Sequence, residues 1–362
     1  MADYRAGRLT EAAERFRSAR QIAVAADDRR SEAWSLQDIV WVTVTRGDFA
    51  VADGALLRAA RRFAELGDPV GRAWLRGTTA FARLLAGRLA EARRLATAFL
   101  PFGERVGEAW AVGTLRAVGA YAAAELGDLT EADAAARRAF RDFSAADDDW
   151  GRGLSLVVRG VVARGLGEPA HARDLLTDAL SCAERTGHPL LVGMAGTVRG
   201  FVHLELDDPA AAAADADRVL SRMTSQSVLP AVRVGPRALR ALADLAAGDT
   251  GTALAELSDI AADAAEPSVL FPRRQAVAGY AQALLAAGCG AEALTWARRA
   301  VDLPAEDVRS RVVAGRVLAQ ALAAVGESDE ALVVAAEAVR EAYGTQQTSE
   351  RVAADSTLAA VG

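Results

Sequence analysis

Arginine and aromatic residues recur in this sequence at intervals of about 40 residues, and residues of both kinds can bind ligands. The planar guanidinium group of arginine forms paired hydrogen bonds with carboxylates and phosphates. Exposed tryptophan, tyrosine and phenylalanine side chains are common anchors for peptides and apolar ligands. The two candidate series are Arg76, Arg116, Arg159, Arg199, Arg237 and Arg240, and Trp34, Trp41, Trp74, Phe81, Tyr121 and Phe201. Their spacing makes binding the first function to consider.

Residues that usually carry catalysis or hold metal ions are few. The three histidines, His171, His188 and His203, stand singly, in a spacing that fits no metal-ligand motif such as HExxH. Cys182 and Cys289 are far apart in the sequence and form no CxxC pair. The sequence has no lysine, so a P-loop and Schiff-base chemistry are both excluded. We therefore predict that the chain is not an enzyme and needs neither a cofactor nor a metal ion.

Charge and hydropathy argue against two further classes of partner. The 42 basic and 48 acidic residues are mixed along the chain and give a net charge of −6, which disfavours direct binding to nucleic acids. We find neither an uncharged apolar run long enough to span a membrane nor the pattern of a signal peptide. Two isolated cysteines fit a reducing compartment. The prediction is a cytoplasmic protein that binds no membrane and no nucleic acid directly.

A short turn pattern repeats along the chain and sets the positions of both series. In the segment 127–132 (GDLTEA), a left-handed glycine can end one helix and the aspartate after it can cap the next. Such turns lie near residues 7, 47, 87, 127, 167, 207, 248, 288 and 326, and a weaker turn follows those from 47 to 288 after about 20 residues. Each unit therefore contains two helices: the first helix precedes the turn near these positions, and the second helix follows it.

The predicted fold is all-α, a superhelical solenoid of about nine helix-turn-helix repeats. Residues 1–345 form the repeat array, and residues 346–362 form a terminal helix that is an incomplete repeat or a cap. Hydrophobic residues make up 52% of the chain but aromatic residues only 6%, and the abundant alanine suits closely packed helices. Because both ends hold incomplete repeats, we expect this chain to be a piece of a larger protein.

Two columns of small residues accompany the turns. An alanine stands five positions after the turn glycine, from Ala12 to Ala331, and a small residue stands seven positions before it: Val40, Ala80, Ala120, Gly160, Gly200, Ala241, Ala281 and Ala319. With these columns the chain resembles the tetratricopeptide repeat (TPR) family, in the long form found in helical arrays of bacterial MalT-like regulators and signalling ATPases. HEAT-type helical repeats are the structural alternative. The TPR resemblance implies that the first helices line a concave groove.

The arginine and aromatic series lie on opposite sides of the first helices, so only one of them can line the groove. In one alternative, each arginine pairs with an acid such as Glu125, Asp174, Glu205 or Asp244 and has a structural role. In the other, the arginines form a ladder in the groove that receives a carboxylate or phosphate. The TPR resemblance places the aromatic offset in the groove.

The aromatic series also has two interpretations. Aromatic residues at helical spacing commonly belong to the core, but exposed ones would be anchors for a ligand. If they are anchors, replacing Trp41 or Phe81 by alanine weakens partner binding and leaves the melting temperature nearly unchanged. A large loss of stability would assign both residues to the core.

Together these patterns predict a non-catalytic scaffold or sensor solenoid that binds a protein or peptide in its concave groove. The resemblance implies that it is the regulatory part of a larger bacterial transcriptional regulator or signalling ATPase. The alternative is a small-molecule receptor whose groove binds an anionic or apolar ligand.

Overall fold

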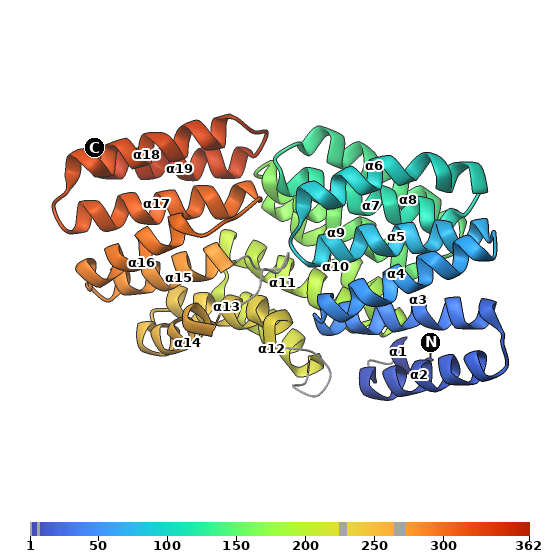
Figure 1. Cartoon of the computed structure of the whole chain (residues 1–362). Helices are drawn as coiled ribbons and strands as arrows, with labels where there is room; N and C mark the ends of the chain where they lie inside the picture. Colours follow the sequence, from blue (N-terminus) through green and yellow to red (C-terminus); the bar gives the residue numbers. More distant parts are fainter. Residues whose placement is uncertain (1, 6–7, 224–229, 264–272) are drawn as a thin grey trace.

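The computed structural model describes all residues except 1, 6–7, 224–229 and 264–272 (Figure 1). The described residues form helices joined by short turns, and they contain no strand. The first helices are α3 (Arg29–Arg46), α5 (Pro69–Leu85), α7 (Ala109–Glu125), α9 (Asp149–Gly165), α11 (Pro189–Glu205), α13 (Pro230–Ala246), α15 (Arg273–Ala286) and α17 (Val308–Ala324). The second helices are α2 (Leu9–Ala25), α4 (Phe49–Glu65), α6 (Leu89–Val106), α8 (Leu129–Ala145), α10 (Pro169–Thr186), α12 (Pro209–Arg222), α14 (Thr250–Asp263), α16 (Gly290–Asp302) and α18 (Ser328–Tyr343). One turn of helix, α1 (Ala2–Arg5), precedes this series, and α19 (Thr348–Val361) follows it.

The turns between first and second helices have the conformation that the sequence predicts. Gly47 ends α3 in the left-handed region with φ 84°, where glycine carries no steric penalty. The amide of Asp48 then donates to the carbonyl of Thr43 at 2.8 Å, and the Asp48 side chain accepts from the amide of Val51 to cap α4. At the turn near residue 207 an aspartate takes the place of glycine, with φ 57°. The predicted turn at Gly7 falls outside the described residues.

The first helices lie on the inner side of the superhelix. Each second helix packs mainly against the first helices on either side of it, whereas successive first helices also pack against one another from α3 to α17. This arrangement brings the first helices closer together than the second helices and curves the array around them. The all-α superhelical solenoid predicted from the sequence is confirmed, and no helix in the described part of the chain is long and apolar enough to cross a membrane.

The superhelix turns far enough to bring its C-terminal repeats beside α7 and α9 (Figure 1). We call residues 345–347, which precede α19, the closure segment. The amide of Gln346 donates to the carbonyl of Gly127 at 3.0 Å, and the Gln347 side chain donates to the carbonyl of Ala124 at 3.1 Å. At Gly127 any side chain would meet Thr345, since an added Cβ would lie 2.7 Å from it. The closure segment therefore joins two parts of the chain that are far apart in sequence.

Candidate functional site

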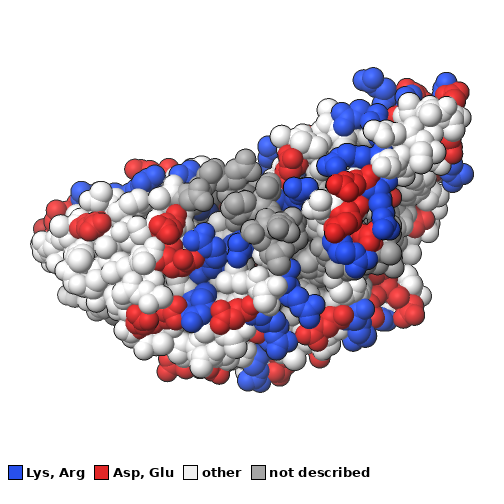
Figure 2. Space-filling view, turned by 90° about the horizontal axis from the view of Figure 1, so that it is seen from below, with Lys and Arg blue, Asp and Glu red and all other residues white. Residues whose placement is uncertain are grey.

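The arginine series faces the second helices. Four of its six members form ion pairs with acids that lie mostly on second helices, and Figure 2 shows arginines and acids interspersed over one face of the molecule. The pairs are Arg116 with Glu104 and Asp142, Arg199 with Asp215, Arg237 with Glu256, and Arg240 with Asp217 and Asp244. Asp244 is the only one of the four acids considered in the sequence that pairs with this series in the described residues. These contacts agree with the first alternative for the four arginines, in which each one pairs with a nearby acid and has a structural role.

The other two arginines also point toward second helices. The guanidinium of Arg76 lies over the Phe102 ring of α6, 3.9 Å from its centroid, in a cation–π contact. Arg159 faces α8, where burial and the nearby Arg137 lower the pKa of its guanidinium. The six arginines thus do not form one continuous ladder along the inner surface.

The aromatic series lies on the inner side, and most of it is buried. Trp41, Phe81, Tyr121 and Phe201 are buried, whereas Trp34 and Trp74 are half-buried. The series divides into two places. Tyr121 and Phe201 line a small central cavity, while the other four join a tryptophan cluster in the N-terminal half.

The tryptophan cluster surrounds a cavity of about 650 Å³. Its walls are formed by Tyr4, Trp41, Trp74, Trp110, Trp150 and His188, from α1, α3, α5, α7, α9 and the residue before α11. Trp74 stacks on Trp110 with ring centroids 4.0 Å apart. Trp41 stands nearly perpendicular to Trp110 and Trp150, at centroid distances of 5.7 and 5.8 Å. The first helices form the inner side of the superhelix, so this aromatic cavity lies on that side, where it opens beside the turns that precede α9 and α11.

Hydrogen bonds hold the far wall of the aromatic cavity. The Tyr4 hydroxyl lies 2.8 Å from the hydroxyl of Thr45 and 3.0 Å from Nε2 of His188. Burial raises the pKa of Tyr4 well above its usual value, so this phenol stays neutral and can serve as a hydrogen-bond donor. The wall thus joins α1 to two first helices that are far apart in sequence.

The rim of the aromatic cavity is acidic. It consists of Asp147, Asp148 and Asp149 at the α8–α9 turn, with Arg185 beside them. Both carboxylate oxygens of Asp149 accept from Arg185 at 2.8 Å, and Asp148 caps α9 by accepting from the amide of Gly151 at 3.1 Å. Hydrogen bonds from Arg185 and Arg152 hold the pKa of Asp149 well below its usual range.

Some residues that line this cavity were not predicted from the sequence. Trp110 and Trp150 are one repeat period apart, so the spacing that pointed to the other aromatic residues also points to these two. Tyr4 and His188 gave no such signal, because they meet only through the curvature of the folded array.

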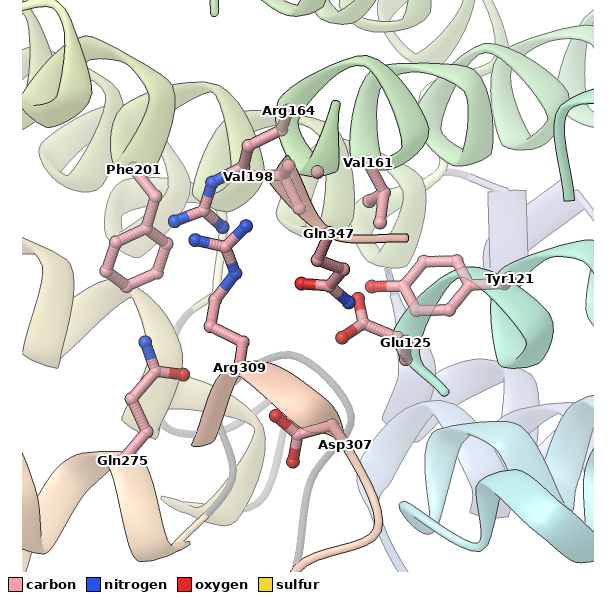
Figure 3. Close-up of a pocket in the computed structure, with 11 residues that line it drawn as sticks. Tyr121, Glu125, Val161, Arg164, Val198, Phe201, Gln275, Asp307, Arg309 and Gln347 are labelled. Carbon is pink, nitrogen blue, oxygen red and sulfur yellow. The ribbon is translucent and has the colours of Figure 1, made fainter. Parts of the chain in front are cut away.

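The second site is a polar cluster at the centre of the superhelix (Figure 3). Arg309 contacts Glu350 at 2.7 Å and Glu205 at 3.2 Å, and Glu205 also accepts from Arg164 at 2.7 Å. Figure 3 shows the guanidinium groups of Arg164 and Arg309 side by side, next to a cavity of about 40 Å³. That volume holds little more than a water molecule. The polar cluster therefore connects repeats and has no room for a ligand.

Glu125 adds an acid with an unusual pKa to the polar cluster. Burial raises its pKa from 4.5 to about 7, and the neighbouring Asp307 adds to this effect. Burial also raises the pKa of Asp307. Near neutral pH, Glu125 is therefore close to the midpoint of its titration.

We predict that Glu125→Gln stabilises the chain by about 3 kcal/mol at pH 8 and by less than about 1 kcal/mol at pH 5. The folded pKa of Glu125 exceeds its unfolded value, so its contribution to stability is complete below the unfolded pKa and is lost as the pH rises through about 7. Glutamine keeps the neutral form at every pH. Urea denaturation of both proteins between pH 5 and pH 8 measures the difference, in which contributions from other titrating groups cancel. A difference that does not vary with pH would contradict the assignment.

Comparison with known proteins rests on structure. No protein-family model and no curated protein matches the sequence. Among solved structures, NprR in complex with its cognate peptide NprX superposes with a TM-score of 0.62 at 9% identity, over 92% of this chain and 98% of that one. A Rap protein complexed with Competence and Sporulation Factor gives 0.56 at 11% identity, over 91% and 97%. The apo form of the quorum sensor NprR from B. thuringiensis gives 0.56 at 10% identity, over 92% and 98%.

The chain has a TPR-type helical-repeat fold. The repeat resemblance found in the sequence is therefore confirmed, and the similarity extends over nearly the whole array. At such low identity the likeness concerns the fold alone. In this TPR-type array, the aromatic cavity gives the inner surface room for a ligand.

Proposed function

We propose that this TPR-type chain is a non-catalytic scaffold that binds a peptide or protein segment in the groove lined by its first helices. The observation that carries the proposal is the aromatic cavity of about 650 Å³ on the concave side. Pockets of this size, lined by aromatic side chains with a few polar groups, are typical of binding sites. Two proteins of similar fold are described in complex with a peptide or a factor, which supports a regulatory role for this array.

The cavity is suited to hold one side chain of a bound segment. Four tryptophans provide rigid apolar walls, and such residues dominate binding energy when a partner covers them. At the rim, the side chain of Asp147 is 94% exposed, so the cavity opens to solvent there. A segment lying along the groove can thus insert a side chain beside the α8–α9 turn.

As a regulatory module, the array would act within a larger bacterial transcriptional regulator or signalling ATPase, in the cytoplasm. A bound segment would contact several first helices at once, so binding would favour one pitch of the superhelix over others. The described contacts between the closure segment and α7 offer a route by which such a change would reach the C-terminal repeats.

The test is selection of peptides from a random displayed library on the immobilised chain, followed by calorimetry. We expect selected peptides to bind Trp110→Leu at least tenfold more weakly than the unchanged chain, because Trp110 forms a wall of the cavity. Leu57→Ala is the control, since Leu57 lies on α4 and its residue is 74% exposed. Failure to enrich any peptide, or equal binding to Trp110→Leu and the unchanged chain, would overturn the proposal.

A small-molecule receptor is the second candidate. The volume of the aromatic cavity lies within the range of small-ligand pockets, roughly 300–1,000 Å³, and its walls come from one continuous set of repeats. Native mass spectrometry of the purified chain distinguishes the two functions: a bound small molecule that Trp110→Leu releases would favour the receptor.

A further inference from the structure

We infer that the aromatic cavity binds a cationic organic group, either an alkylammonium or a guanidinium group. The cation would be carried by a side chain of the bound segment, in which case the inference rests on the proposed function, or by a free small molecule. This assignment differs from the anionic or apolar ligand considered in the sequence.

The arrangement of the rings supports a cation. Trp110 and Trp150 lie within 26° of parallel, with centroids 6.1 Å apart, and Trp41 stands across both of them at 74° and 85°. Tyr4 and His188 close another side, with centroids 5.0 Å apart. Ring faces and edges from different directions thus border one space. The face of an aromatic ring attracts a cation within about 6 Å, and tryptophan does so most strongly.

The charges around the cavity also favour a cation. Its lining contains three aspartates and one arginine; together with Arg152, which contacts Asp147 and Asp149, this group carries a net charge of −1. The arginine, Arg185, is held by both carboxylate oxygens of Asp149 and is therefore already paired. The Asp147 carboxylate contacts Arg152 at 3.3 Å. A carboxylate or phosphate entering at this rim would meet net negative charge, whereas a cation would be attracted.

Asp38 adds a further acid on the same side of α3. It lies four residues after Trp34 and three before Trp41, so the three residues share one helix face. Asp38 is half-buried, and no hydrogen bond or ion pair to it is found among the residues that the structure describes. Burial raises the pKa of the Asp38 carboxyl to about 6, and a cation bound in the neighbouring cavity would favour its charged form.

A matched pair of small probes tests the assignment without a peptide. Choline and its neutral isostere 3,3-dimethyl-1-butanol differ chiefly in charge. Five of the six tryptophans belong to the cluster around the cavity, so fluorescence of a Trp296→Phe variant reports almost solely on this site. We expect saturable quenching by choline, with the neutral isostere at least tenfold weaker. Equal affinity for both probes would overturn the assignment.

A charge variant at the rim supplies a second readout that does not disturb folding. Asp147→Asn should weaken choline binding by about two- to fivefold, the effect of one exposed charge, and should leave binding of the neutral isostere unchanged. Asp27→Asn is the matched control, because Asp27 has nearly the same positive φ, 50° against 51°, and is 86% exposed, but does not line the cavity. Equal effects of the two variants on choline binding would overturn the assignment.

Neutral replacements in the selected peptides separate this inference from the proposed function. In each selected peptide, lysine is replaced by norleucine or arginine by citrulline, which removes charge and keeps much of the shape. A loss of at least tenfold in affinity supports a peptide cation in the cavity. Selected peptides that bind in the groove and tolerate both replacements overturn the inference and leave the proposed function standing. Choline binding without any selected peptide supports the cation site and overturns the peptide function.

Discussion

Arg309→Met is expected to destabilise the chain by about 3 to 5 kcal/mol. The Arg309 side chain is only 14% exposed, and its guanidinium contacts Glu350, whose side chain is 3% exposed. Removing the cation leaves the Glu350 carboxylate buried without its ion-pair partner, which costs far more than the pair itself contributes. Urea denaturation followed by circular dichroism measures the loss. Because repeat arrays unfold in parts, we expect hydrogen exchange to accelerate first in α17 and α19.

Two further variants separate the charge from the packing. Arg309→Met combined with Glu350→Leu removes both charges and should recover much of the lost stability. Arg298→Met removes an exposed ion pair with Glu327 and Glu330 and should change stability by less than about 1 kcal/mol. If Arg309→Met and Arg298→Met had equal effects, the polar cluster would not hold the repeats together.

Trp41→Ala is also expected to destabilise the chain by about 3 to 5 kcal/mol. Trp41 is 6% exposed, and its ring packs against Phe81, Trp110 and Trp150. The cavity left by alanine would merge with the aromatic cavity, so ligand binding should be lost together with stability. Thermal and urea denaturation measure the loss, with Leu57→Ala as the exposed control. An unchanged melting temperature would instead place Trp41 among exposed anchors, the interpretation that its buried position does not favour.

The helical array could be predicted from the sequence because its cause is local. Left-handed glycines and capping aspartates act over a few residues, and their regular period survives in the sequence. Asp48 and Gly47 perform in the structure the roles that their types predict. The direction of the arginine series was harder to predict, because it depends on which acids of the second helices face Arg116 or Arg199.

Contacts across the superhelix could not be predicted from the repeat. Gln347 reaches Ala124, 223 residues earlier, and Tyr4 reaches His188, 184 residues later. Such contacts depend on the curvature summed over many repeats, and small changes in each repeat move the ends by large distances. No local pattern in the sequence records that sum. The aromatic cavity is partly of this kind, since its tryptophans follow the period but its far wall does not.

The central claim is that the aromatic cavity on the concave side is where a bound segment is anchored. A crystal structure of the chain with a selected peptide tests it most directly. We predict the peptide along the first helices, with a lysine or arginine side chain in the aromatic cavity, against the wall formed by Trp41, Trp110 and Trp150. A peptide bound on the outer surface of the second helices, with the aromatic cavity empty, would contradict it.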